Sequence, residues 1–478
     1  MTFKEDGAIA IEALEAFAAR ALAGEGPVIN QPRITELAHR LELDRLIAEG
    51  GLAGERLRQF LDTYLAASTR LYHPAYMAHQ VAVPVATSAI AALVDGFTNN
   101  AMAIYEMGPA AATVERTVVD WMLRKVGWSP EPAEDATDRS QVSGGGVLTH
   151  GGSLANLTAL LAARARIAPD AWENGSPEGL VIVATAGSHY SVARAAGIMG
   201  LGQKAVRHAP TDALGRMDPA QLPAFLASLR GEGVTPLAVV ANACATALGL
   251  YDPLREIAHV CRAEGVWLHI DGAHGASALV SPRLRHLLDG VELADSLIWD
   301  AHKMLRTSIL CAAVLVRDRR DLDHAFREEA SYLFHDKDQP GFDFIHRTVE
   351  CTKAALGLKV FCALASGGEG AIGAGIEQQT DLAHEAAALL RAEPGIEVAV
   401  EPQSNIVCFR LEGPDDLQIE LRRRLIEAGD FYISTTEAMG RRWLRLALMN
   451  PASGLADVER LVGSLREHLA AALGGDCA

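Results

Sequence analysis

The chain has 478 residues, of which 49% are hydrophobic and 22% charged, and its formal net charge is −17. This length exceeds the ~250–300 residues that one hydrophobic core usually holds, so we expect two or three packed units. The acidic balance argues against nucleic acid or an anionic membrane as a partner.

The seven cysteines are scattered along the chain without a CxxC pair, which argues against a disulfide framework and against a structural zinc site. Residues Met1 to Asp6 are polar and charged, and no apolar segment typical of a secretory signal follows them. No stretch reaches the ~18 apolar residues of a membrane-spanning helix. We therefore expect a cytoplasmic protein that binds neither a metal nor a membrane.

Residues 1–84 are predicted to form an N-terminal helical segment. Apolar residues recur at helical spacing through 8–70, and the Gly24–Pro27 break and the Gly50-Gly51 pair interrupt them. A helical segment of this kind either packs on a partner subunit or covers its own domain, and the pattern is compatible with both.

Residues 85–366 are predicted to form a large α/β domain. Short continuous apolar runs at 181–184, 237–240, 266–270 and 312–316 alternate with helical stretches at 153–167, 190–200, 216–230 and 253–264. Continuous runs are typical of strands buried on both faces, so we expect a mainly parallel sheet covered by helices. Ligands of such sheets bind at the carboxyl ends of the strands.

A small C-terminal α+β domain is predicted for residues 367–478, after the Gly367-Gly368 pair. The expected strands are 396–400, 405–411, 431–435 and 443–448, and the expected helices are 375–391, 415–428 and 455–472. Before this domain, a loop at about 327–346 is rich in Asp, His, Gly and aromatic residues, and we predict that it is mobile.

Asp271 and Lys303 are the residues from which a function can be inferred. Asp271 closes the apolar run 266–270, and Lys303 follows another apolar run in the segment Asp300-Ala301-His302-Lys303. A lysine amine forms a Schiff base with the aldehyde of pyridoxal 5′-phosphate (PLP), and an aspartate beside the pyridine nitrogen keeps that ring protonated. Alone, Asp271 could be a turn residue and Lys303 a surface lysine, but together they predict a PLP site.

Two further segments fit this prediction. The glycine-rich stretch Gly144–Ser153 leads into a predicted helix, whose N-terminus offers free N–H groups and a positive dipole end to a phosphate. His189 follows the strand 181–185 and could stack on a flat ring. Read alone, the stretch would be an ordinary turn and His189 a surface residue; downstream Asp271 and Lys303 favour the functional interpretation.

These segments resemble the group II PLP-dependent amino-acid decarboxylases, the family of glutamate, cysteine-sulfinate, aromatic-amino-acid and diaminobutyrate decarboxylases. The resemblance runs from about His73-Pro74 to Arg445 and is most specific at 151–156, 189–191, 266–275 and His302-Lys303. It implies the PLP-dependent transferase type I fold. It also implies a homodimer with active sites at its interface, and decarboxylation of an L-amino acid to an amine and CO2.

The resemblance assigns roles at the cofactor. Lys303 would bond covalently to PLP, Asp271 would pair with the ring nitrogen and His189 would stack on the ring. The remaining cofactor residues that it implies are Gly152, Ser153, Thr246 and His302, of which Gly152, Ser153 and His302 would contact the phosphate.

It also assigns roles at the substrate. Arg445 would bind the α-carboxylate, His79 and Gln80 would shape the pocket, and Tyr332 on the predicted mobile loop would protonate the substrate carbon after CO2 leaves. The segment 99–106 and Tyr332-Leu333-Phe334 look more like the branch that acts on acidic amino acids (glutamate, aspartate or cysteine sulfinate).

Asp300 departs from the family pattern, which has asparagine at this position. The motif Asp-x-His-Lys resembles that of the sphingosine-phosphate lyase type. An alternative is therefore another type I PLP lyase, cleaving a carbon–carbon or carbon–sulfur bond of an amino-acid-like or phosphorylated amino-alcohol substrate. A third interpretation, a catalytically silent protein that retains PLP, predicts the absorbance of a bound Schiff base without turnover.

Overall fold

The computed structural model describes residues 2–132, 141–326 and 341–474. The chain divides into two compact units, which we call the sheet unit (Pro84–Thr380) and the terminal unit (Met1–Val83 with Asp381–Ala478). This division differs from the predicted one, because the residues expected to form an N-terminal segment and those expected to form a C-terminal domain share one unit.

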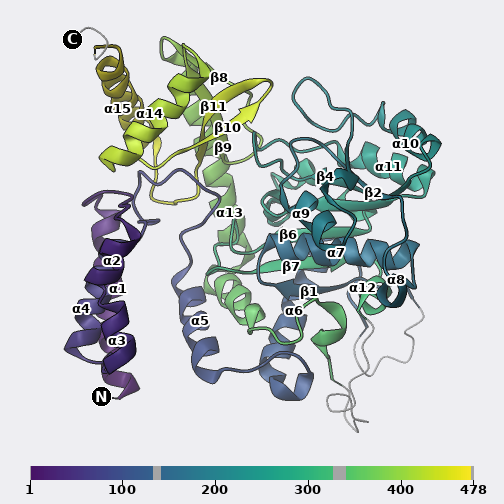
Figure 1. Ribbon diagram of the computed structural model, residues 1–478, viewed down its shortest axis with the longest axis horizontal. Coiled ribbons are helices and arrows are strands. Elements are labelled where there is room, and N and C mark those ends of the chain that lie inside the picture. Colours follow the sequence, from purple (N-terminus) through teal and green to yellow (C-terminus); the bar gives the residue numbers. More distant parts are fainter. Residues whose placement is uncertain (1, 133–140, 327–340, 475–478) are drawn as a thin grey trace. The chain divides into compact units, whose positions relative to one another are not determined.

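The sheet unit alternates strands and helices along the chain (Figure 1). Its strands are β1 (Gly145–Thr149), β2 (Leu180–Ala184), β3 (Val206–His208), β4 (Thr235–Asn242), β5 (Trp267–Asp271), β6 (Ser296–Asp300) and β7 (Ala312–Val316). Its α-helices are α5 (Ala86–Thr98), α6 (Pro109–Val126), α7 (Gly152–Ile167), α8 (Ala171–Asn174), α9 (Ser191–Ile198), α10 (Leu222–Gly231), α11 (Leu254–Glu264) and α12 (Arg320–Ala325). Short 3₁₀ helices occupy Tyr105–Met107, Gln203–Ala205, Gly275–Val280, Arg285–Leu288, Val291–Leu293 and Phe344–Arg347.

Within the described residues these strands form one seven-stranded sheet, in the order β1-β7-β6-β5-β4-β2-β3. β6, β5, β4, β2 and β3 run parallel to one another, and β7 pairs antiparallel with both β6 and β1. Helix α7 packs across β1, β4, β5, β6 and β7 (Figure 1), and α6, α10 and α11 also contact the strands. Every residue of β1, β2, β5, β6 and β7 is buried, so both faces of the sheet are covered. The predicted mainly parallel α/β architecture is confirmed.

The start of β5 shows how local sequence positions the central strands. Helix α11 ends at Glu264, and Gly265 follows it in the left-handed conformation (φ 64°), which costs glycine little. Its backbone N–H donates to the carbonyls of Cys261 and Arg262, and this cap turns the chain directly into β5. Alternate side chains of β5 then point to opposite faces of the sheet.

The terminal unit contains α1 (Phe3–Leu22), α2 (Ile34–Arg40), α3 (Leu43–Glu49), α4 (Glu55–Ala66), α14 (Asp415–Ala428) and α15 (Leu455–Gly474). A four-stranded antiparallel sheet of its described residues has the order β10-β11-β9-β8. These strands are β8 (Ile396–Val398), β9 (Ile406–Leu411), β10 (Ser434–Ala438) and β11 (Arg441–Ala447). Ala75 and Met77 lie in the same hydrophobic core as this sheet.

The Gly367-Gly368 pair does not separate two domains. It lies inside α13 (Leu356–Ala392), where Gly368 has φ 75° and produces a kink in an otherwise continuous helix. The unit boundary falls later, between Thr380 and Asp381, because Ala383 and Leu390 pack in the core of the small sheet. Among the described residues, no helix combines the length and the apolar character needed to cross a membrane.

Candidate active site

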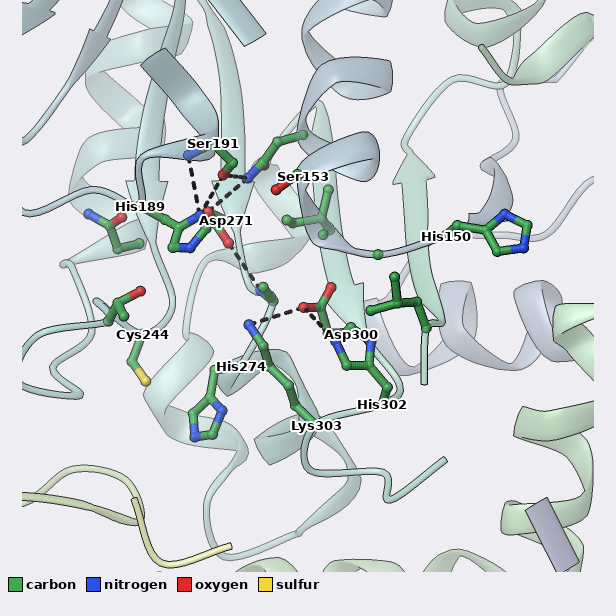
Figure 2. Close-up of a pocket in the computed structure, with 18 residues that line it drawn as sticks. His150, Ser153, His189, Ser191, Cys244, Asp271, His274, Asp300, His302 and Lys303 are labelled. Carbon is green, nitrogen blue, oxygen red and sulfur yellow. Dashed lines mark hydrogen bonds and ion pairs between the residues drawn. The ribbon is translucent and has the colours of Figure 1, made fainter. Parts of the chain in front are cut away.

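A cavity of about 320 Å³ lies at the carboxyl ends of β4, β5 and β6 (Figure 2). The structure brings together in its lining all seven residues predicted to bind the cofactor: Gly152, Ser153, His189, Thr246, Asp271, His302 and Lys303. Asp271 is the last residue of β5, and Lys303 follows the end of β6 by three residues.

Asp271 is buried with two hydrogen-bond donors beside its carboxylate. The side-chain amide of Asn156 donates to Oδ2 at 3.0 Å, and the backbone N–H of Ala273 donates to Oδ1 at 3.2 Å. The side chain is 7% exposed. Both carboxylate oxygens accept a hydrogen bond, so the side chain is held in one orientation at the cavity.

His189 lines the same cavity and is held by Ser191 at the start of α9. Its Nδ1 lies 2.7 Å from the Ser191 hydroxyl and 3.3 Å from the Ser191 backbone N–H (Figure 2). Partial burial lowers the pKa of His189, and although the nearby Asp271 carboxylate opposes this shift, the net direction is downward. The imidazole is therefore neutral near neutral pH.

Lys303 forms an ion pair with Asp300, its Nζ lying 3.0 Å from Asp300 Oδ2 (Figure 2). Asp300 is 2% exposed, and its other oxygen, Oδ1, has no hydrogen-bond donor among the described residues. His302 contacts the same carboxylate, with its Nε2 3.7 Å from Asp300 Oδ2, and its Nδ1 is 2.7 Å from the carbonyl oxygen of Cys311, the residue before β7.

The turn before α7 contains fewer residues than the glycine-rich stretch Gly144–Ser153. Gly145 and Gly146 belong to β1, where a Cβ on Gly146 would lie 2.6 Å from the Val314 carbonyl oxygen, so these glycines permit close strand pairing. The turn itself is Gly151, with φ +101°, followed by Gly152 at the first helical position. The first glycines of the stretch therefore belong to the strand, and the residues predicted to contact the phosphate, Gly152 and Ser153, lie at the start of α7.

The lining suits a small phosphorylated pyridine aldehyde. The first N–H groups of a helix have no acceptor within the helix, and those of Gly152 and Ser153 face no acceptor elsewhere in the described chain. A Cβ on Gly152 would come within 2.8 Å of Asp300 Oδ1, so only glycine leaves this position open. The start of α7, a lysine amine and a buried carboxylate thus share one cavity.

The family described as the pyridoxal-dependent decarboxylase conserved domain matches residues 58–412. The chain belongs to this family. It is a PLP-dependent amino-acid decarboxylase with the type I fold, and the match favours decarboxylation over the carbon–carbon and carbon–sulfur lyase alternatives.

Relatives of this decarboxylase differ in their substrates. It is 34% identical over 409 residues to an L-2,4-diaminobutyrate decarboxylase of Rhizobium meliloti, covering 83% of this chain and 78% of the relative. It is 30% identical over 454 residues to the cysteine sulfinic acid decarboxylase of Mus musculus, covering 90% and 88%. The crystal structure of mouse CSAD matches 96% of this chain and 98% of its own, with a TM-score of 0.85 and 27% identity.

Several residues that line the decarboxylase cavity were not predicted to be site residues. They include His150, Asn156, Ser191, Asn242, Cys244 and His274. Asn156 could have been found from its spacing, because it lies four residues after Gly152 and therefore on the same face of α7. Ser191 comes two residues after His189, but nothing in the sequence shows that it binds the imidazole.

The predicted substrate residues of the decarboxylase do not line this cavity within the described residues. Arg445, His79 and Gln80 belong to the terminal unit. There, Arg445 Nη1 donates to the Ala78 carbonyl oxygen at 3.3 Å, and His79 Nε2 lies 3.0 Å from the Tyr432 hydroxyl. Their substrate roles remain predictions, and Tyr332 lies outside the described residues.

Proposed function

We propose that this decarboxylase removes the α-carboxylate of an acidic L-amino acid, namely glutamate, aspartate or cysteine sulfinate, and releases the corresponding amine. The observation that carries the proposal is the cavity in which Lys303, Asp271, His189 and the Gly152 turn meet. The cysteine sulfinic acid decarboxylase of Mus musculus, which matches this chain over 454 residues, supports the acidic substrate class.

In this proposal each cofactor contact uses a group that the cavity already presents. Lys303 Nζ would bond to the cofactor aldehyde, and the N–H groups of Gly152 and Ser153 would hold its phosphate at the start of α7. Asp271 would accept a hydrogen bond from the protonated pyridine nitrogen, and the neutral ring of His189 would face the cofactor.

When bound, PLP supplies an electron-withdrawing ring that stabilises negative charge at the substrate Cα. The residues of this chain bind, orient and move protons around that centre. Arg445 would bind the departing α-carboxylate, and Tyr332 would deliver a proton to Cα after CO2 leaves. Lys303 would recover its bond to the cofactor as the amine product departs.

A diamino acid is the second candidate substrate. Asp300 lines the cavity with one carboxylate oxygen that has no donor among the described residues, and Glu350 contacts His150 at the same cavity. These carboxylates would suit a substrate with a second amino group. The Rhizobium meliloti relative, 34% identical, decarboxylates L-2,4-diaminobutyrate according to its name.

A substrate panel tests the proposal. The purified enzyme with PLP is incubated separately with each proteinogenic amino acid, cysteine sulfinate and 2,4-diaminobutyrate, and CO2 release is measured. We expect the highest kcat/KM for an acidic amino acid and no release by Lys303→Ala. A preference for 2,4-diaminobutyrate would overturn the acidic assignment, and no CO2 from any substrate would overturn the decarboxylase proposal.

We also propose that the enzyme is a homodimer. Helix α5 carries apolar side chains at helical spacing that are strongly exposed: Ile90 (59%), Leu93 (51%), Val94 (44%) and Phe97 (66%). Such a stripe on one helix face is typical of a covered interface rather than of solvent-exposed surface. Light scattering should give twice the 50.9 kDa chain mass for the wild type, and a smaller mass for Ile90→Glu with Phe97→Glu. A monomeric wild type would refute the dimer.

A further inference from the structure

A continuous row of buried polar side chains lies behind the cavity, along β5. Trp267, His269 and Asp271 occupy alternate positions of this strand, so all three face the same side of the sheet. His269 is fully buried and lies opposite Ser296 in the register of β5 and β6. Asn156 of α7 completes the row, which extends for about 13 Å at ~3.3 Å per strand residue.

The direction of the first hydrogen bonds follows from Trp267. An indole N–H can only donate, and it donates to the Ser296 hydroxyl oxygen at 2.8 Å. Ser296 Oγ also lies 2.8 Å from His269 Nδ1. Either of these two groups could donate to the other, so the direction of this hydrogen bond has to be derived from the contacts of Asn156.

Asn156 decides it. An ionised carboxylate can only accept, so the Asn156 atom 3.0 Å from Asp271 Oδ2 is the amide nitrogen. The amide oxygen of Asn156 then faces His269 Nε2 at 2.8 Å, and His269 Nε2 must carry a proton. Burial lowers the pKa of His269 to about 4, so the ring carries this single proton and Nδ1 accepts from Ser296.

The row also reaches His189. The second amide N–H of Asn156 donates to Ser191 Oγ at 2.8 Å, so the Ser191 hydroxyl proton is available to His189 Nδ1 at 2.7 Å. The Ser191 backbone N–H points at the same ring nitrogen. His189 Nδ1 is therefore an acceptor, and the neutral ring carries its proton on Nε2.

We propose that His269 is a positioning residue, which fixes the orientation of the Asn156 amide and thereby controls both Asp271 and His189. This inference deepens the proposed function and rests on it. If the amide turned over, its oxygen would face the Asp271 carboxylate and the Ser191 oxygen, and two acceptors would meet. The Nε2 proton of His269 adds to the preference set by Asp271, because the amide oxygen can accept this proton and the amide nitrogen cannot.

The orientation of the Asn156 amide affects how the cofactor ring is bound. The Asn156 amide N–H holds the Asp271 carboxylate in place opposite the ring nitrogen, so a displaced amide would leave Asp271 Oδ2 without this donor. His269 has no contact with the cavity itself, since it is absent from the lining, and so it acts only through Asn156.

The test uses the full chain, stripped of cofactor and titrated with PLP. The variant His269→Phe keeps a flat ring and removes the proton, whereas His269→Gln keeps an N–H donor. We expect His269→Phe to bind PLP about ten- to a hundredfold more weakly, the effect of losing one hydrogen bond to a charged group. We also expect a shifted pH midpoint in the absorbance of its bound cofactor. His269→Gln should remain within about threefold of the wild type.

Two controls separate positioning from general destabilisation. Ile270→Val trims the neighbouring side chain on the opposite face of β5, and it should lower the melting temperature without moving the pH midpoint. Ser296→Ala removes the donor to His269 Nδ1 and should give a smaller shift in the same direction as His269→Phe, so it carries the test if His269→Phe does not fold.

The outcomes distinguish this inference from the proposed function. If the wild type fails to bind PLP through Lys303, the proposed function is wrong. If the wild type binds PLP and both His269→Phe and Ser296→Ala match its affinity and pH midpoint, the positioning role of His269 is overturned while the proposed function stands.

Discussion

A buried ion pair supports the strand that leads into the active site. Lys353 and Glu115 contact each other and are both inaccessible to solvent. Lys353 Nζ also donates to the Leu148 carbonyl oxygen at 2.5 Å, and the Leu148 backbone N–H donates to Glu115 Oε1 at 3.0 Å. The pair therefore holds both backbone groups of a β1 residue that lies just ahead of the Gly151-Gly152 turn.

Replacing Lys353 by methionine should strongly destabilise the sheet unit. Burial already raises the pKa of Glu115, Lys353 is the main opposing influence, and its removal leaves an unpaired buried carboxyl group and an unsatisfied Leu148 carbonyl. Breaking one partner of a buried pair costs about 3–5 kcal/mol. At roughly 2 °C per kcal/mol for a unit of this size, the melting temperature should fall by about 6–10 °C.

Thermal unfolding of a double-mutant cycle measures this effect. Glu115→Gln combined with Lys353→Met leaves no buried charge, so the double variant should be more stable than Lys353→Met alone, with a coupling of about 2 kcal/mol or more. Lys359→Met is the matched control, because Lys359 is also buried but, among the described residues, donates only to the Ile309 carbonyl at 3.5 Å. A Lys353→Met protein that melts no earlier than Lys359→Met would refute this reasoning.

Three further predictions concern the site. Gly152→Ala places a Cβ 2.8 Å from Asp300 Oδ1, so PLP affinity should fall at least about tenfold. The affinity should recover partly when Asp300→Ala is added. An unchanged PLP affinity of Gly152→Ala in a direct titration would contradict this prediction. Asp300→Asn removes a negative charge beside the turn, and inorganic phosphate should compete with PLP roughly tenfold better, as measured by displacement. His269 has its folded-state pKa lowered from 6.5 to about 4, so its contribution to stability is complete above pH 6.5 and is lost as the pH falls toward 4. In urea unfolding, the free energy of unfolding of the wild type should fall by about 3 kcal/mol more than that of His269→Gln between pH 6.5 and pH 4. Curves of unfolding free energy against pH that run parallel for the two proteins would contradict the lowered pKa of His269.

The positions of the cofactor residues could be predicted because buried parallel strands have a simple sequence pattern. An apolar run that ends in a polar residue places that residue at the carboxyl edge of the sheet, and this rule located Asp271 at the end of β5. Helix α7 was expected at 153–167 and occupies Gly152–Ile167. The roles of these residues in catalysis remain proposals.

Contacts between distant parts of the sequence could not be predicted. Lys353 and Glu115 are 238 residues apart, and neither segment shows that it will meet the other. Gly145 and Gly146 resemble a turn because glycine is common there, although in β1 they allow a neighbouring strand to come close. The hydrogen bonds of His269 depend on Ser296 and Asn156, which join it only once three elements have packed.

The terminal unit has a consequence for how the protein is made on the ribosome. Its two segments, Met1–Val83 and Asp381–Ala478, are separated by the entire sheet unit. Met77 donates its backbone N–H to the Tyr432 carbonyl oxygen and accepts a hydrogen bond from the Ala447 N–H, so its partners are synthesised more than 350 residues later. At about 5–20 residues per second, the first segment waits many seconds with its apolar side chains uncovered, a period in which a chaperone could bind it. The sheet unit, which is continuous in sequence, faces no such delay.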